Sequence, residues 1–345
     1  MAEKKNFTPV SDLGEFGLID HLTKDIQPTQ KTNIKGVGDD AAVFACVSDR
    51  VGLLASDILV EGIHFDLSYS PLKHLGYKSV VVNVSDIYAM NGVPERITVA
   101  IAASSRFPVE AFDEIYEGIK LACSQYSVDL VGGDISASHK GLIISIAAYG
   151  TAAKDKVVMR STAKEGDLIC LSGDLGAAYL GLQILEREKR IFMENPGVQP
   201  DLEKYPYLIE RQLKPEARKD IPAFFEKLDF LPTAMIDVSD GLASDLLHIC
   251  HQSGLGAEIR ENDIFIRQEA QMMALEFQLD PVTCALSGGE DYELLFTIDP
   301  GDQEKLAYMT DISVIGEMKN KKDGVKLRTM KDNLHDVTAQ GWKHY

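Results

Sequence analysis

Seven aspartates set in short runs of glycine, serine and asparagine constrain this chain more than any other feature. They are Asp39, Asp40, Asp57, Asp86, Asp134, Asp237 and Asp240. Small neighbouring residues allow tight turns, so that a carboxylate and the bare backbone N–H groups beside it face a ligand. Hard divalent cations prefer oxygen ligands, and phosphate groups bridge such ions. The pattern predicts an Mg²⁺-dependent enzyme that handles a nucleoside triphosphate.

Length and charge narrow the class of protein. With 345 residues, the chain exceeds the roughly 250–300 residues at which a single core usually stops growing. We therefore expect two domains, 1–152 and 153–345, joined at the polar segment 151–166. The net charge of −18 and a pI near 4.9 argue against binding nucleic acid or an anionic membrane through a basic face.

The cysteines and the apolar segments indicate a compartment. Five cysteines lie far apart and form no C-x-x-C pair, which argues against both a disulfide framework and a zinc site. The N-terminal residues lack the apolar core of a signal peptide. No uncharged apolar stretch approaches the roughly 20 residues that span a bilayer. We expect a cytoplasmic protein.

Strand-like and helix-like segments alternate, which is typical of an α/β fold. We expect strands near 41–47, 51–56, 97–103, 128–133, 141–150, 167–173 and 233–237, and helices near 73–91, 109–126, 174–188 and 240–250. The segment 189–206 carries no motif, and its role stays open.

Three acidic positions gain weight from their sequence context. Asp86 lies in an apolar segment, where an unpaired carboxylate would cost several kcal/mol, so a bound cation or a structural Arg or Lys must face it. Asp134 ends a predicted strand, the place where open α/β sheets bind ligands. Asp237 also ends a predicted strand, and Ser239 or Asp240 is placed to cap the helix that follows. Asp39 and Asp40 suit either a ligand site or a plain turn.

Known nucleotide-binding motifs are missing. The sequence contains no Gly-Lys dipeptide, hence no Walker A loop, and no H-R-D or D-F-G set of the protein kinases. ATP would therefore be held through aspartate-bound Mg²⁺. Arg160 is a candidate phosphate contact or a solvated arginine, and His64 and Trp342 suit either a ligand or a packing role.

Eight motifs together carry a family resemblance. They are GEFGLID, GDDAA, SDILVEGIHF, NVSDIYAMNG, VGGDIS, DVSDGLASD, SGGEDYELLF and GWKHY, spread from Gly14 to Tyr345. Together and in this order they resemble the thiamine-monophosphate kinases, members of the superfamily that includes aminoimidazole ribonucleotide synthetase. Each motif alone is weak, but eight in register are specific.

The resemblance implies direct transfer of a phosphoryl group from Mg·ATP to thiamine monophosphate, without a covalent phosphoenzyme and without a general base. It implies two α/β domains (an α+β arrangement), a homodimer formed through the N-terminal sheet, and an ATP cleft between the domains. The implied metal ligands are Asp40, Asp57, Asp86, Asp134 and Asp237, assisted by Ser56 and Asp240. The implied ATP contacts are Tyr116, Gly133, Asp134, Arg160 and Ser239, and the implied substrate contacts are His64, Glu290 and Trp342.

Two other functions are compatible with parts of the sequence. One is a synthetase of the same superfamily that activates a substrate oxygen with ATP and releases phosphate; SGGEDYELLF and GWKHY argue against it. Relatives that carry selenium or carbamoyl groups use a terminal cysteine, and no cysteine lies near either end. The other is a non-catalytic Mg²⁺- or nucleotide-binding protein, which the intact set of carboxylates disfavours. Ala55 stands where relatives often carry Thr or Ser, so only its backbone carbonyl could serve as a ligand.

Overall fold

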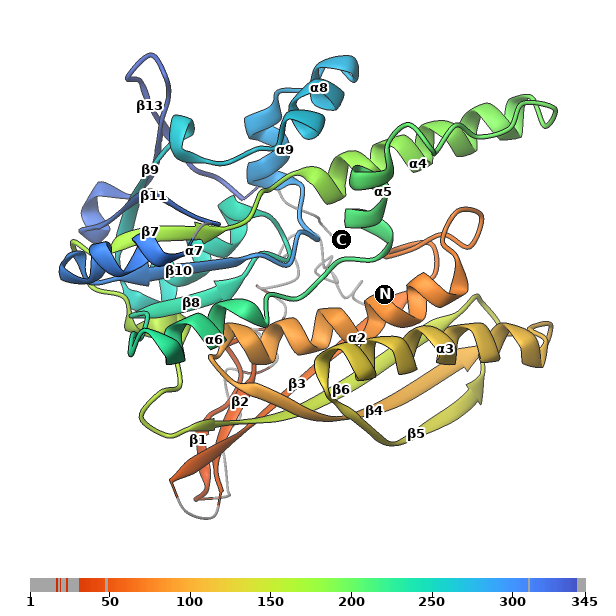
Figure 1. The fold of residues 1–345 in the computed structure, drawn as a ribbon, viewed down its shortest axis with the longest axis horizontal. Helices are drawn as coiled ribbons and strands as arrows, with labels where there is room; N and C mark the ends of the chain where they lie inside the picture. The colour runs from red at the N-terminus through yellow and green to blue at the C-terminus, as the bar shows by residue number, and fades with distance from the viewer. Residues whose placement is uncertain are drawn as a thin grey trace, which may run out of the picture.

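Two β-sheets with helices packed against them make up the protein (Figure 1). The computed structural model describes residues 17, 19, 23, 31–46, 49–309 and 311–339. Trp342 and the motif GWKHY lie outside the described residues. All five cysteines are described and free. Within the described residues, no helix has the length and apolar character needed to cross a membrane.

The first half contains a six-stranded sheet in the order β1-β2-β3-β6-β4-β5. Its strands are β1 (Asn33–Lys35), β2 (Ala42–Ala45), β3 (Arg50–Val60), β4 (Val93–Ala103), β5 (Asp129–Ala137) and β6 (Ile143–Ala153). All neighbours pair antiparallel except β4 and β5, which are parallel. Helices α2 (Leu72–Ala89) and α3 (Val109–Tyr126) cover one face of this sheet (Figure 1). The opposite face carries no described helix.

Helix α2 is buried almost all round, with 14 of its 18 residues inaccessible to solvent. A helix with apolar residues on every side has to be enclosed by other elements. One side of α2 faces the first sheet, and the other meets the second half of the chain. Polar side chains on this helix are therefore held inside the molecule, between its two halves.

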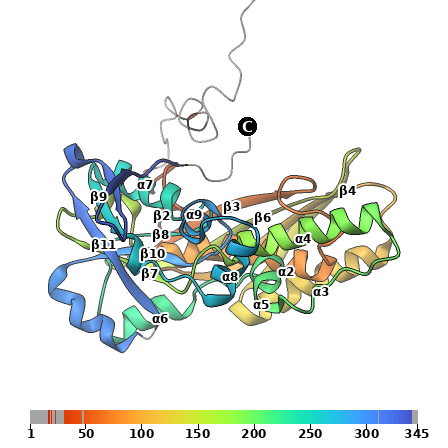
Figure 2. The same cartoon turned by 90° about the horizontal axis from the view of Figure 1, so that it is seen from above.

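The second half contains a seven-stranded sheet in the order β13-β12-β9-β11-β7-β10-β8. Its strands are β7 (Leu168–Ser172), β8 (Ala234–Asp237), β9 (Gly256–Arg260), β10 (Leu294–Ile298), β11 (Ile312–Lys319), β12 (Val325–Arg328) and β13 (Leu334–Asp336). Its α-helices are α4 (Ala177–Glu194), α5 (Pro206–Leu213), α6 (Asp220–Lys227), α7 (Leu242–Ser253), α8 (Gln268–Glu276) and α9 (Pro281–Ser287). Figure 2 shows this sheet at one end of the long axis and the far ends of α3 and α4 at the other.

The sequence patterns located the elements well but misplaced several ends. Helix α3 has the predicted bounds, whereas β5 runs to Ala137, so Asp134 lies inside a strand and the prediction of a strand end was wrong. Asp57 likewise lies inside β3. Pairing with β4 continues β5 through its two glycines, because ladder hydrogen bonds outweigh weak local strand preference. Helix α4 extends to Glu194 and takes in the start of the unassigned segment 189–206.

The segment between α5 and α6 fastens the second half to the first. The carboxylate of Glu216 accepts hydrogen bonds from the hydroxyls of Tyr77 (2.7 Å) and Tyr126 (2.6 Å), which lie on α2 and α3. Lys214 adds an ion pair at 3.0 Å. Burial raises the pKa of Glu216, but the hydrogen bonds from Tyr126, Tyr77 and Lys214 outweigh it, so the pKa is lowered overall from 4.5. The folded protein therefore favours the ionised carboxylate.

The contact of Glu216 with the two tyrosines is expected to stabilise the folded protein at neutral pH and to lose this effect in acid. A lowered folded pKa gives stability that is present above the ordinary pKa of 4.5 and is lost as the pH falls through the folded value. We expect E216Q to cost about 1 kcal/mol at pH 7, the low end for bonds to a charged group because the carboxylate is partly exposed. The cost should vanish in acid. Denaturant midpoints over a pH series test this, with exposed Glu114→Gln on α3 as control; a pH-independent difference would contradict it.

Candidate functional site

Three aspartates from different parts of the chain meet between the two halves. Asp40 follows the turn after β1, Asp86 lies on α2, and Asp237 ends β8. One carboxylate oxygen of each lies within 4.8 Å of the others. Carboxylates so close repel one another strongly in a protein interior, and either bound protons or bound cations offset this repulsion.

Burial makes this repulsion costly. Asp40 is 8% exposed and Asp237 only 2%. Burial, followed by the neighbouring charges of Asp57 and Asp237, raises the pKa of Asp86 well above its usual range. Burial and Asp40 do the same to the pKa of Asp237. Burial and Asp40 also raise the pKa of Asp39, to about 7.

Among the described residues, Arg160 is the basic side chain in contact with the cluster. Its guanidinium donates to both oxygens of Asp40, at 2.8 and 2.7 Å. A second neighbour, Ser85 on α2, donates its hydroxyl hydrogen to Asp237 at 2.5 Å across the two halves. One arginine cannot balance three ionised aspartates, so the remaining charge is offset by protons, in line with the raised pKa of Asp86 and Asp237, or by a bound cation.

The donor set fits divalent cations. Besides the three clustered carboxylates, Asp57 Oδ2 and Asp39 Oδ2 are buried oxygens without a hydrogen-bond partner. Asp57 is held from the other side, because its backbone N–H donates to Asn83 Oδ1 at 3.1 Å. Buried oxygens left unpaired beside further carboxylates are the ligands that Mg²⁺ prefers.

Two loops of the second half close over the cluster. The N–H of Glu290 donates to the carbonyl of Ser239 (2.7 Å), and that of Tyr292 donates to Val238 (2.9 Å). Gly289 has φ of 71°, and a Cβ there would lie 2.6 Å from the Ser239 carbonyl oxygen, so only glycine allows this approach. Gly241 is the N-cap of α7, and no side chain caps this helix, so the predicted capping by Ser239 or Asp240 was wrong.

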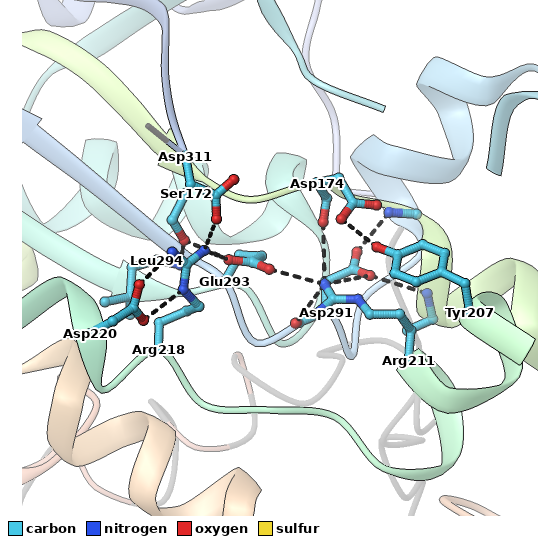
Figure 3. A network of polar contacts seen from close by, with 12 residues as sticks. Ser172, Asp174, Tyr207, Arg211, Arg218, Asp220, Asp291, Glu293, Leu294 and Asp311 are labelled. Atoms are coloured by element: carbon cyan, nitrogen blue, oxygen red, sulfur yellow. Dashed lines mark hydrogen bonds and ion pairs between the residues drawn. The ribbon is translucent and has the colours of Figure 1, made fainter. Parts of the chain in front are cut away.

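A buried ionic network supports the loop that carries Glu290 (Figure 3). Asp291 accepts the backbone N–H groups of Gly176 and Ala178 at 2.7 and 3.1 Å, and Arg211 lies beside it at 3.6 Å. Farther along, Glu293 lies between Arg211 and the second arginine of Figure 3, Arg218. Glu290 and Tyr292 have φ of 59° and 52°, a strained left-handed backbone that needs such support.

A cavity of about 640 Å³ adjoins the cluster. Most of the predicted site residues line it: Asp40, Ser56, Asp57, His64, Asp86, Arg160, Ser239, Asp240 and Glu290. The Val60 backbone N–H donates to Nδ1 of His64 at 3.0 Å, which places the hydrogen of the neutral ring on Nε2. One wall is a face of α4, tied to the first half by Tyr69–Glu186 (2.7 Å) and Asp66–Lys189 (2.6 Å) contacts.

Among the described residues, four predicted ones do not line this cavity: Asp134, Gly133, Tyr116, and Asp237, which belongs to the adjoining cluster. Asp134 lies on the edge strand β5, exposed to solvent along its whole length, and pairs with Ala100 of β4. Strands β6 and β4 separate β3 from β5, so Asp134 lies three strand spacings, about 14 Å, from the strand that carries Asp57. Gly133 is its neighbour, and Tyr116 packs on α3 against the core of the first half.

Several lining or supporting residues escaped the sequence patterns. Lys78 and Gln212 hold Glu290, and neither belongs to a motif with an obvious chemical role. The cavity-lining face of α4 could have been found from the sequence, because its polar and aromatic residues Tyr179, Gln183 and Glu186 are spaced three and four apart, as on one face of a helix. Ser85 lies in the tripeptide Val-Ser-Asp that recurs at 238–240, a repetition too short to interpret by itself.

Comparison with known proteins gives consistent matches. Residues 38–152 match the family AIR synthase related protein, N-terminal domain, and residues 164–327 match AIR synthase related protein, C-terminal domain. The thiamine-monophosphate kinase of Aquifex aeolicus (strain VF5) is 34% identical over 339 residues, 97% of this chain and 99% of that protein. The thiamine-monophosphate kinase of Bacillus subtilis (strain 168) is 31% identical over 96% of this chain and 100% of that protein.

Solved structures agree. AaThiL complexed with AMPPCP and TMP has a TM-score of 0.82 and 32% identity, covering 98% of this chain and 99% of that one. The hydrogenase maturation protein HypE of E. coli has a TM-score of 0.66 at 16% identity, over 85% of this chain and 87% of that one, which is a likeness of fold alone.

The cluster predicts that Asp237→Asn changes the free energy of unfolding differently in Mg²⁺ and in EDTA. Removing one of three repelling carboxylates should preserve or raise stability in EDTA, since asparagine can still accept the Ser85 hydrogen bond. Mg²⁺ at a hundredfold excess over its Kd stabilises a binding protein by about 2.7 kcal/mol. D237N should lose most of this gain, as measured by denaturant unfolding with Mg²⁺ or EDTA. The exposed Asp113→Asn serves as control; equal Mg²⁺ gains in both variants would contradict the assignment.

Proposed function

The chain belongs to the thiamine-monophosphate kinases, within the AIR synthase related proteins, and we propose that it converts thiamine monophosphate to thiamine diphosphate with ATP. The observation that carries the proposal is the three-aspartate cluster, two of whose members, Asp40 and Asp86, line a large cavity between the two halves. A relative that covers nearly the whole chain binds AMPPCP and TMP. We propose two domains, 1–152 and 153–345; the end of the first sheet at Ala153 and the start of the second at Leu168 support a division in this part of the chain.

The acidic cluster is the proposed metal site. Asp40, Asp86 and Asp237 would hold Mg²⁺, with Asp57 beside them and Ser56 and Asp240 at the cavity wall. Mg²⁺ bound there supplies positive charge that neutralises the repelling phosphates of ATP and substrate. Arg160 adds a planar donor fork suited to phosphate oxygens. Ser239 precedes the N-terminus of α7, whose dipole favours anions.

The reaction needs no general base. An oxygen of the substrate phosphate already carries negative charge and forms the new P–O bond, while the bond from the γ-phosphorus to ADP breaks. Phosphoryl transfer depends mainly on alignment and charge stabilisation, with little covalent work for the protein. No covalent phosphoenzyme forms. The chain's part is to hold both phosphates in line and to keep water out.

The rest of the cavity accommodates the thiamine part. His64 and Glu290 line it, and the aromatic rings of Tyr69 and Tyr179 lie on its walls. Thiamine carries a cationic thiazolium ring and an amine-bearing pyrimidine, which suit aromatic faces and carboxylate acceptors. Trp342, outside the described residues, remains a predicted third contact.

A homodimer would explain how Asp134, which lies far from the acidic cluster of its own subunit, takes part in a metal site. The open face of the first sheet exposes Leu54 (46%) and Ile58 (51%) on β3. Asp134 lies on the same face, because the register places Ile58, Ser145, Ala100 and Asp134 side by side across the sheet. An open sheet face with exposed apolar side chains suits contact with a second copy of the same sheet. Since Asp134 lies about 14 Å across the sheet from β3, it reaches a metal site only in the partner subunit. We propose the same origin for the contacts from Gly133 and Tyr116.

A subunit-mixing experiment tests this arrangement. Asp134→Asn and Asp237→Asn should each abolish activity as homodimers. Unfolding and refolding an equal mixture should restore about a quarter of the wild-type activity, because half the dimers are mixed and each holds one intact site. A monomer in sedimentation, or mixtures that stay inactive, would overturn the shared site.

The activity itself is measured by incubating the protein with Mg·ATP and thiamine monophosphate and separating the products. We expect thiamine diphosphate and ADP in equal amounts, and no product with EDTA. D86N should lower the rate at least a hundredfold, as loss of a group that stabilises transferring charge does. ADP with free phosphate and no thiamine diphosphate would indicate the substrate-activating synthetase instead.

A further inference from the structure

Glu290 is fixed at both of its oxygens by residues that lie outside the sequence motifs. Lys78 Nζ lies 2.9 Å from Oε1, and Gln212 Nε2 donates to Oε2 at 2.7 Å. The side chain is 25% exposed, on the cavity side. A carboxylate has about four acceptor positions, so two remain for a ligand. Its orientation is therefore set before any ligand arrives.

Lys78 is an unusual residue to find at this place. It is 4% exposed and comes from α2 in the first half, whereas Glu290 and Gln212 belong to the second. Its second hydrogen bond goes to the Gln212 carbonyl oxygen, at 3.1 Å. A buried ammonium is costly unless it is paired, and replacement by an apolar residue often suits stability equally well. Lysine is explained better by a role toward Glu290 than by packing.

Helix α2 places this pair at a defined distance from the acidic cluster. Lys78, Val82 and Asp86 are spaced by four residues and so lie on one face of the helix. Val82 and Asp86 line the cavity. Eight residues of helix rise by about 12 Å, so the backbones of Lys78 and Asp86 lie about two turns apart on one helix.

We propose that Lys78 is a positioning residue that fixes Glu290 as the acceptor for the amine-bearing heterocycle of the substrate. This inference rests on the proposed function. Because the lysine and the carboxylate come from opposite halves, substrate recognition depends on their closure around the ligand. In the proposed function the phosphates of ATP are held at the acidic cluster, so ATP gains nothing from this contact.

The test separates the KM values of the two substrates. K78M keeps an unbranched side chain, one atom shorter, and removes its charge. We expect the KM for thiamine monophosphate to rise about tenfold and the KM for Mg·ATP to change less than twofold, the pattern of a lost substrate contact. The control is K73M on the same helix, whose exposed ammonium pairs with Glu117 at 3.2 Å and which should leave both KM values unchanged.

A double-mutant cycle decides whether Lys78 acts through Glu290. In an E290Q background, K78M should raise the KM for thiamine monophosphate no further, because coupled residues are not additive. Equal changes in both KM values, or an undiminished effect of K78M in E290Q, would reduce Lys78 to a structural link. The unfolding midpoint of each variant, taken alongside, identifies a loss that comes from instability.

The proposed function can fail separately. If the wild-type protein forms no thiamine diphosphate, the activity is wrong and these KM values do not exist. In that case, binding of thiamine monophosphate to wild type and K78M by calorimetry still tests the contact. A Kd for K78M equal to that of the wild type would then overturn the positioning role as well.

Discussion

The mutual repulsion of buried carboxylates organises this protein. Asp40, Asp86 and Asp237 come from a turn, a helix and a strand end, and they meet where the two halves touch. Nothing in a hydrophobic core favours such a meeting, and with one arginine nearby the like charges oppose it. The surrounding contacts are arranged to hold the group together: Arg160 on Asp40 and Ser85 on Asp237. In the proposed function, cations that arrive with a phosphate substrate would complete the balance of charge.

Helix α2 connects this cluster to the rest of the cavity. It is enclosed between the first sheet and the second half, and its polar residues have separate tasks. Asn83 holds the strand that carries Asp57, and Ser85 and Asp86 serve the cluster. Lys78, two turns earlier, holds Glu290. One rigid element thus fixes both ends of the site, which is how a fold keeps reacting groups at a set separation.

The second half contributes strained loops and the supports that maintain them. The left-handed backbone at Glu290 and Tyr292 would relax without the buried arginines beneath it (Figure 3). Strain of this kind persists where the surroundings over-determine the conformation, and it is concentrated at functional sites. The same segment that carries Arg211 also docks Glu216 on the two tyrosines of the first half. The support of the loop and the contact between the two halves therefore come from one short stretch of chain, from Arg211 to Arg218.

The sequence by itself determined the local elements and the chemistry. Apolar periodicity gave α3 its ends, and aspartates among small residues indicated a cation site, because both properties depend on neighbours in the chain. Only the tertiary structure decided which carboxylates meet. It brought Asp86 to Asp237 and left Asp134 on an edge strand, since distance across a sheet depends on strand order, which no local pattern encodes. It also gave Lys78 a partner 212 positions later in the chain, a contact that exists only because the two halves close on each other.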